Sequence, residues 1–423
     1  MSKCPENLCV IPFVHLTSKP NGAVRLCCFS TKYIKDQSGN QLFFGRDSLE
    51  QIWNSHDMRG VRMKMLNNEK LTECRYCWDE EANGKTSKRM RENKRFLKSY
   101  ERHLESAQNN KGYISEYPSY LDLRLGNKCN LKCRTCNPLF SSAWLKEIER
   151  NKANMTKNSF IQNLYQSDFN RSRDRTDWYE TETFFNTVKK ISKDLRLVYI
   201  SGGEPLLIKS QHLFIDHFLK TGAYKKIVIN MNTNLTYLDK SLLEKLARFK
   251  RANFSVSIDA YGAKNNWIRS PSRFAKIEKN MERVINLSGN VNVSINCTVS
   301  VYNILYLSEL IDWSRNIAKR WNKNIPIVHF DLLHHPFFQQ ISILPFSLKE
   351  KAMDRLNQIK ERVQLFPTEI KDMNSLIKIL QSSFEENKKI QELRSQLKEH
   401  TKIFDRWRKE DFFSVFPEFI GHL

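Results

Sequence analysis

The sequence predicts an α/β protein in which a partial (β/α)6 barrel lies between a small cysteine-rich α+β module and a helical C-terminal extension. Three observations support this prediction. Strand-like and helix-like segments alternate from residue 118 to residue 335, six of the ten cysteines lie before residue 80, and apolar residues recur at helical spacing after residue 347. Consecutive βα units form a parallel sheet with helices outside, either open or curled into a partial barrel.

The middle region contains six expected strands. They are Tyr120–Leu125, Leu195–Ser201, Lys226–Asn232, Asn253–Asp259, Val291–Val299 and Pro326–Leu332. Between them lie segments such as SQHLFIDHFLK and YLSELIDWSRNIAKRW, whose apolar residues recur every three or four positions and so predict helices with one buried face. Catalytic side chains in such folds sit at the C-terminal ends of the strands, so we expect the functional residues there.

Composition divides the chain into four predicted parts. They are an N-terminal module (1–90), a basic linker helix (91–117), the barrel (118–335) and a helical extension (336–423). The densest basic segment, KTSKRMRENKRFLKSYER from Lys85 to Arg102, is interpreted as one exposed helix face. The aromatic residues of the final segment, FDRWRKEDFFSVFPEF, are expected to pack on the core.

The bulk composition is that of a soluble globular protein, with 40% hydrophobic and 27% charged residues. No apolar run approaches the ~20 residues of a membrane helix. The N-terminus lacks the basic start and apolar stretch of an export signal, so we expect a cytoplasmic protein without a membrane partner. The net charge of +23 indicates attraction to an acidic partner such as nucleic acid, although solvated surface lysines explain it as well.

The most informative motif is a cysteine trio directly after the first expected strand. In LRLGNKCNLKCRTCNP, Cys129, Cys133 and Cys136 form a Cx3Cx2C pattern. Three thiolates on one short loop hold three irons of a [4Fe–4S] cluster and leave the fourth iron open to another ligand, whereas ordinary clusters use four cysteines. The alternatives are a zinc site, which more often pairs two CxxC motifs, and a chance trio.

A cysteine trio of this spacing after the first strand of a βα series resembles the radical S-adenosylmethionine (SAM) superfamily. The resemblance implies that the region folds as a partial TIM-like barrel. After the second strand comes Ser201–Pro205, SGGEP, which is similar to the GGE segment of that family. The resemblance implies that Gly202, Gly203 and Glu204 approach the methionine amino group of SAM. Glycines let the backbone come close to a ligand, and a carboxylate suits an amine.

Two further strand ends are similar to family motifs. The third strand carries Asn232 and Asn234 in a TNG-like turn, and the fourth carries Ser257 and Asp259 in a stretch similar to SxSxDG. In both motifs the usual glycine is replaced, by leucine and by alanine. The resemblance implies contacts with the SAM carboxylate or ribose. Asp259 is also the candidate catalytic residue, because it could face the substrate as a proton acceptor.

The fifth strand and the loop before it supply two more candidates by resemblance. Asn296 lies where the family places a polar SAM contact, and Arg269 in NNWIRSP is similar to an arginine often found after the fourth strand. For each strand-end residue taken singly, a simple capping role is the alternative. Cys297 is expected to be a buried core residue rather than a ligand.

A second group of cysteines precedes the barrel. Cys9, Cys27, Cys74 and Cys77 are the predicted ligands of a second, fully protein-ligated [4Fe–4S] cluster, with Cys28 the substitute for Cys27. A structural zinc site with the same thiolates is the alternative. The glycine turn, the cysteine, the IW-containing helix and the CxxC are together similar to twitch or SPASM auxiliary-cluster modules. Those modules usually follow the radical SAM core, whereas this one precedes it.

The resemblance implies a radical SAM enzyme that binds SAM and reductively cleaves it to a 5′-deoxyadenosyl radical, which abstracts hydrogen from a substrate. Twitch and SPASM relatives act mostly on peptides or proteins, which are therefore the expected substrates. The alternatives are dehydrogenation of a small molecule or carbohydrate, modification of RNA, and a non-enzymatic iron–sulfur module. An enzyme of this type also needs a low-potential electron donor such as flavodoxin or ferredoxin.

Overall fold

The protein is described by a computed structural model. Its described residues are 5–82, 86–96, 101–152, 160–165, 177–324, 326–382 and 386–422. The chain divides into two compact units. The first comprises residues 1–127, 174–231 and 244–252, and the second comprises 128–173, 232–243 and 253–423. No helix within the described ranges is long and apolar enough to cross a membrane.

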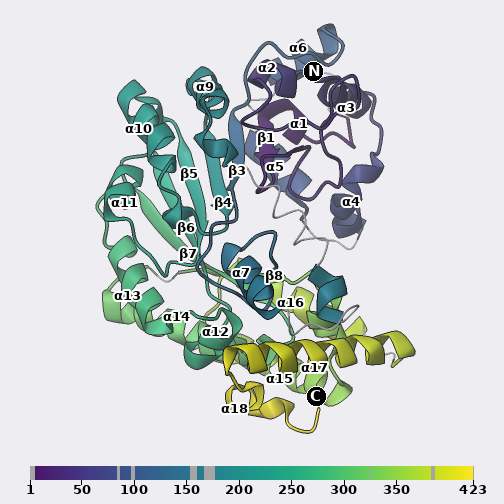
Figure 1. The fold of residues 1–423 in the computed structure, drawn as a ribbon, viewed down its shortest axis with the longest axis vertical. Helices are drawn as coiled ribbons and strands as arrows, with labels where there is room; N and C mark the ends of the chain where they lie inside the picture. Colours follow the sequence, from purple (N-terminus) through teal and green to yellow (C-terminus); the bar gives the residue numbers. More distant parts are fainter. Residues whose placement is uncertain are drawn as a thin grey trace. The chain divides into compact units, whose positions relative to one another are not determined.

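The described residues contain one eight-stranded sheet with the order β2-β1-β3-β4-β5-β6-β7-β8. Its strands are β1 (His15–Ser18), β2 (Val24–Arg25), β3 (Tyr120–Leu125), β4 (Leu197–Gly202), β5 (Val228–Thr233), β6 (Arg251–Ser257), β7 (Val291–Val299) and β8 (Val328–Leu332). Strands β3, β4 and β5 run parallel side by side (Figure 1), as do β7 and β8. The strand order ends at β2 and β8, so the sheet is open, and the predicted α/β class is confirmed.

The N-terminal segment contributes to this sheet as well, although the sequence indicated a separate module. Strand β1 pairs in parallel with β3, with His15 opposite Tyr120 and Thr17 opposite Asp122. Strand β2 pairs with β1 in the antiparallel direction. These strands have four and two residues, so they are too short to show a period-two pattern in the sequence.

The helices of the first unit include two on the segment expected to be a single linker helix. They are α1 (Ile11–Val14), α2 (Leu49–Trp53), α3 (His56–Leu66), α4 (Arg75–Ala82), α5 (Lys88–Phe96), α6 (Glu101–Asn109), α9 (Glu182–Ile191) and α10 (Gln211–Thr221). Local sequence sets several starts. Ser48 and Gln51 form a reciprocal capping box at α2, which satisfies otherwise unpaired N–H groups.

The basic segment is not one exposed helix face, which corrects the prediction. Lys88 on α5 is buried, and the guanidinium of Arg89 pairs with the carboxylate of Glu81 at 2.5 Å. Arg89 also donates to the carbonyl of Leu8 at 3.0 Å. Two of the cations therefore point into the fold, because each meets an internal partner. Lys85 and residues 97–100 of this segment lie outside the described residues.

The second unit holds the C-terminal helices, and the predicted helical extension is confirmed. Its helices include α7 (Ser142–Asn151), α12 (Gly262–Ile268), α13 (Phe274–Ile285), α14 (Leu307–Trp321), α15 (Phe346–Arg362), α16 (Pro367–Ser382), α17 (Lys388–Arg408) and α18 (Phe412–Val415). Phe404 on α17 packs with Trp144 on α7 in a buried cluster (Figure 1 shows both helices). Phe412, Phe416 and Phe419 are buried too, as the sequence predicted for the terminal aromatics.

The strands have two chemically different faces. Side chains alternate across a strand, so residues two apart share a face. One face is apolar and nearly fully buried: Val198, Ile200, Ile229, Met231, Phe254, Val256, Ile295, Cys297 and Val299. The other is polar and partly exposed: Tyr199, Ser201, Asn230, Asn232, Asn253, Ser255, Ser257, Ser294, Asn296 and Thr298. The burial of Cys297 confirms its expected place in the core, and the polar face is the one that can contact a ligand.

Candidate functional site

The cysteine loop, residues 129–136, lies in the second unit and precedes α7. Its first and middle residues are held by hydrogen bonds from both sides. The backbone N–H of Cys129 donates to the Ser142 hydroxyl at 3.1 Å, and the indole N–H of Trp144 donates to the Cys133 carbonyl at 2.7 Å. These two bonds join the loop to the start of α7, and its three cysteine residues are partly exposed.

The three thiols of this loop are electrostatic neighbours. Burial raises the pKa of Cys136, and the charges of Cys133 and Cys129 raise it further. Burial also raises the pKa of Cys133, whereas the nearby Arg269 cation lowers it. Three thiolates crowded in this way repel one another, and a bound cationic centre offsets that repulsion. The trio therefore fits a group that binds thiolates, such as an iron–sulfur cluster.

Asn234, just after β5, stands next to the cysteine loop, and its expected contact with SAM stays a prediction. Its amide nitrogen lies 3.9 Å from the Sγ of Cys129 and donates to the Oδ1 of Asn130 at 3.2 Å. Asn130 donates in turn to the hydroxyl of Thr236 at 2.8 Å. This chain of bonds fixes the end of β5 against the first cysteine. An amide that donates toward a sulfur stabilises the thiolate form.

Three of the predicted SAM contacts lie on the polar face of the strands. Asn232, Ser257 and Asn296 are each partly exposed on β5, β6 and β7. Strands β6 and β7 are joined here, because the backbone N–H of Ile258 donates to the carbonyl of Asn296 at 3.1 Å. The contact of these three residues with SAM stays a prediction.

Asp259, the candidate catalytic residue, is fully buried in an ion pair. Its Oδ2 lies 2.7 Å from the Nε of Arg269, whose Nη2 donates to Oδ1 at 2.9 Å. The backbone N–H of Thr298 also donates to Oδ1 at 2.9 Å. Burial alone would lower the pKa of Arg269, but the Asp259 carboxylate raises it above its ordinary value. Asp259 thus ties Arg269 to strand β7, and its role as a proton acceptor stays a prediction.

Gly202, Gly203 and Glu204 belong to the first unit and end strand β4. Gly202 has a φ of +126°, and a Cβ there would lie 2.9 Å from the carbonyl oxygen of Gly126. The N–H of Gly203 donates to that same carbonyl at 3.2 Å. The buried Glu204 carboxylate accepts from the N–H of Leu206 at 3.0 Å. The close approach of the backbone at β3 therefore already requires glycine at 202, and the expected contact with SAM stays a prediction.

The second group of cysteines lies within the first unit. Burial raises the pKa of Cys9, and the charges of Cys27, Cys74 and Cys77 raise it further. Burial raises the pKa of Cys27 to about 11 and that of Cys74 to about 12. The four predicted ligands are therefore close enough to sense one another's charge, as the ligands of one cluster would be.

Cys28 has a different partner from the four predicted ligands. Its sulfur accepts a hydrogen bond at 3.1 Å from the ammonium group of the buried Lys88. Lys88 also lies 3.9 Å from the carboxylate of Asp122 on β3. Cys28 is also a charge neighbour of Cys27 and Cys77, so the choice of Cys27 over Cys28 as the ligand stays a prediction. The polar cluster of Lys88 and Asp122 was missed in the sequence, because a lysine in a basic helix gives no sign that it is buried.

Thiol geometry alone leaves the bound metal unspecified. Among the described residues, no three His, Cys, Asp or Glu side chains form a group that could hold a single metal ion. A cluster attaches each thiolate to a separate iron, so its ligands need not surround one point.

Family models match both cysteine-containing regions of the chain. The model described as Radical SAM superfamily matches residues 123–313, which include the cysteine loop. The chain carries a radical SAM domain. A second model, SPASM, described as an iron–sulfur cluster-binding domain, matches residues 9–78 and precedes it in the chain, as predicted. The chain thus carries a radical SAM domain and a SPASM domain, and these two domains imply [4Fe–4S] clusters and SAM as cofactors.

Solved structures of radical SAM proteins are also similar to this chain. AnSMEcpe with bound AdoMet is 17% identical, with a TM-score of 0.37 over 57% of this chain and 60% of that chain. Streptococcus suis SuiB bound to S-adenosylmethionine is 15% identical, with a TM-score of 0.36 over 82% of this chain and 70% of that chain. SuiB bound to the precursor peptide SuiA is 14% identical, with a TM-score of 0.37 over 83% and 71%.

The chain spans about 60% of the length of anSMEcpe. Among proteins with curated functions, none matches the chain significantly.

Proposed function

We propose that this enzyme reductively cleaves SAM to a 5′-deoxyadenosyl radical and abstracts hydrogen from a peptide or protein substrate. The observation that carries the proposal is the trio Cys129, Cys133 and Cys136, three neighbouring thiols on one loop inside the matched radical SAM domain. Three cysteines leave one iron of a [4Fe–4S] cluster without a protein ligand, where SAM can bind.

The bound cluster and SAM supply the radical chemistry, and the protein supplies binding and orientation. In the proposed site the loop thiolates hold the first cluster, and the amide of Asn234 supports the thiolate of Cys129. The proposed SAM contacts are Gly202, Gly203, Glu204, Asn232, Asn234, Ser257 and Asn296. The apolar face of the strands packs against helices, which keeps water from that side of the sheet.

In the proposed domain arrangement, residues 1–90 form the auxiliary module, 91–117 the linker, 118–335 the radical SAM core and 336–423 the extension. Cys9, Cys27, Cys74 and Cys77 are the proposed ligands of the auxiliary cluster. A peptide substrate is favoured by the SPASM domain, whose relatives act mostly on peptides. The electron donor is proposed to be a flavodoxin or ferredoxin. A sugar is the second candidate substrate for the same radical SAM reaction.

SAM cleavage tests the first part of the proposal. The reconstituted and dithionite-reduced protein should release 5′-deoxyadenosine and methionine from SAM, as measured by liquid chromatography. The triple variant C129A/C133A/C136A should lose this activity yet keep the iron of the N-terminal site. The matched control is C297A, which removes a buried thiol that lies outside the loop. Wild-type protein that holds both clusters but releases no 5′-deoxyadenosine would overturn the proposal.

Isotope transfer tests the substrate class. The enzyme is incubated with SAM and a fully deuterated peptide digest, or with a pool of deuterated monosaccharides. Hydrogen abstraction moves deuterium from the substrate carbon into 5′-deoxyadenosine, where mass spectrometry detects it. Deuterium from the peptides supports a peptide substrate. Transfer from the sugars alone would replace it with the carbohydrate candidate.

A further inference from the structure

The cysteine loop contains a buried arginine between its second and third cysteines. Arg134 has no solvent exposure, and its Nη2 lies 2.6 Å from both the Oδ1 of Asp405 and the Oε2 of Glu410. The guanidinium also lies 3.9 Å above the ring of Trp267. Both carboxylates come from the C-terminal extension, more than 250 residues away in the chain. An arginine buried this deeply is expected only with such partners.

A second ion chain joins the same loop to the same extension. The ammonium group of Lys132 lies 2.5 Å from the carboxylate of Glu147 on α7. The guanidinium of Arg408, near the end of α17, binds that carboxylate at 2.6 Å. Glu147 and Arg408 are nearly inaccessible to solvent, with side-chain exposures of 5% and 1%. Screening by water is therefore weak along this chain of charges.

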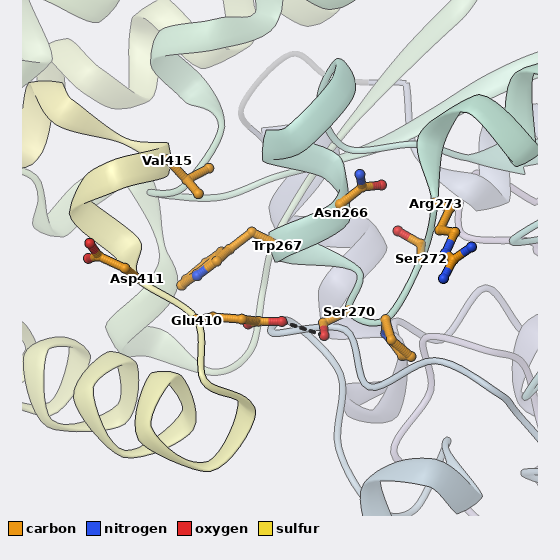
Figure 2. A pocket seen from close by; sticks show the side chains of 9 residues that line it. Asn266, Trp267, Ser270, Ser272, Arg273, Glu410, Asp411 and Val415 are labelled. Carbon is orange, nitrogen blue, oxygen red and sulfur yellow. Dashed lines mark hydrogen bonds between the residues drawn. The ribbon is translucent and has the colours of Figure 1, made fainter.

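The backbone of the loop is hydrogen-bonded to a segment that also contacts the C-terminal extension. The N–H groups of Lys132 and Arg134 donate to the carbonyls of Ser270 and Ile268 at 2.6 and 2.7 Å. Glu410 then accepts a hydrogen bond from the hydroxyl of Ser270 at 2.6 Å, which Figure 2 shows beside a cavity of about 440 Å³. The carboxylate of Glu410 thus binds Arg134 of the loop and also Ser270, the residue whose carbonyl accepts a hydrogen bond from the loop.

These contacts go beyond simple packing. Three charged side chains, Arg134, Glu147 and Arg408, are buried beside the cysteine loop, and hydrophobic residues would fill that space at lower desolvation cost. A polar network of four ion pairs specifies one geometry more strictly than an apolar contact. Arg134 directly follows Cys133 in the sequence, so the network is anchored on the same stretch of backbone that carries this thiol.

We propose that Arg134 is a positioning residue of the radical SAM site. Together with Asp405 and Glu410, it holds the cysteine loop in the conformation that receives the cluster, and these charges set the reduction potential of that cluster. The inference rests on the proposed function, since it concerns the cluster that the loop would bind. The C-terminal extension is then a working part of the site, and its removal would disorder the loop.

The test uses full-length R134Q, D405N and E410Q, with E418Q as the matched control. Glu418 pairs with Arg355 at 3.0 Å on the same extension, away from the cysteine loop. Two readouts are used. Hydrogen exchange of the apoprotein measures the protection of the Lys132 and Arg134 amides, and redox titration followed by electron paramagnetic resonance measures the potential of the first cluster.

The proposal predicts faster exchange of the loop amides in R134Q, D405N and E410Q but not in E418Q. It also predicts potential shifts of opposite sign. Loss of a carboxylate favours the more negative reduced cluster and raises the potential, whereas loss of the Arg134 cation lowers it. Loop damage alone would shift all three variants in the same direction. The proposal is overturned by shifts of one sign, or by loop exchange no faster than in E418Q.

The outcomes also separate this inference from the proposed function. Hydrogen exchange requires neither SAM nor bound iron, so loop order is measured even if the wild-type protein fails to cleave SAM. If the wild-type protein cleaves SAM but no variant changes the loop exchange or the cluster potential, the positioning role of Arg134 is overturned and the proposed function is kept. If one variant does not fold, loop exchange in the remaining two is still compared with that in E418Q, and exchange no faster than in E418Q overturns the proposal.

Discussion

Replacement of Asp259 by Asn removes the charge from a fully buried ion pair while it keeps the shape of the side chain. Arg269, whose side chain is 11% exposed, then loses a partner that it contacts at 2.7 and 2.9 Å. Loss of one member of a buried pair costs about 3–5 kcal/mol, because the other charge remains desolvated. The N–H of Thr298 also loses a charged acceptor. We therefore expect the free energy of unfolding to fall by about 4 kcal/mol in D259N.

A double-mutant cycle with R269Q measures this coupling. The double variant D259N/R269Q removes both charges and should recover about half of the loss, since no uncompensated charge remains. The assay is urea unfolding followed by hydrogen exchange of peptides from the second unit. Additive losses in the two single variants, or a cost below about 1 kcal/mol for D259N, would refute the view of Asp259 as a buried structural anion.

The same variant decides whether Asp259 is also catalytic. If Asp259 has only a structural role, the folded fraction of D259N should form as much product per 5′-deoxyadenosine as the wild-type protein does. A proton acceptor would instead be needed after hydrogen abstraction, so D259N would form 5′-deoxyadenosine without the normal product. The ratio of product to 5′-deoxyadenosine therefore separates the two roles independently of stability.

Three further predictions concern other parts of the chain. Burial, with help from nearby arginine cations, lowers the pKa of His400 well below its usual value. The unfolded state therefore binds one more proton than the folded state below about pH 6.5. The free energy of unfolding should then fall by up to ~1.4 kcal/mol for each unit that the pH is lowered, and this dependence should be absent in H400Q. Denaturation at pH 5, 6 and 7 measures it. G202A should destabilise the first unit by about 1–3 kcal/mol, because the added Cβ would lie 2.9 Å from backbone atoms. G60A should instead stabilise it by about 0.5–1 kcal/mol, because Gly60 lies within helix α3 and nothing is within 4 Å of the added Cβ. Thermal melts compare the two variants. In iron analysis, C27S should lose about four irons per chain and C28S none, and the reverse order would reassign the ligand.

Much of the fold was predictable because it depends on local pattern. Strands β3 and β7 begin and end at the expected residues, and the other four barrel strands differ by one or two residues at their ends. Period-two alternation of buried apolar and partly exposed polar residues marks these strands strongly. The polar side chains Tyr199 and Asn230 could have been added to the candidate site by that same alternation. Short strands were expected in the N-terminal α+β module, but β1 and β2 are too short for the sequence to show that they join the barrel sheet.

By itself, the sequence determined the cysteine trio, its place after the first barrel strand, and a second cysteine module ahead of it. Those features depend on spacing along the chain, which a single sequence contains in full. Only the tertiary structure decided that Asp259 is locked to Arg269, and that Arg134 of the cysteine loop is bound by two carboxylates of the C-terminal extension. Buried ion pairs join residues far apart in the chain, and a charged side chain looks the same in sequence whether it faces water or an internal partner.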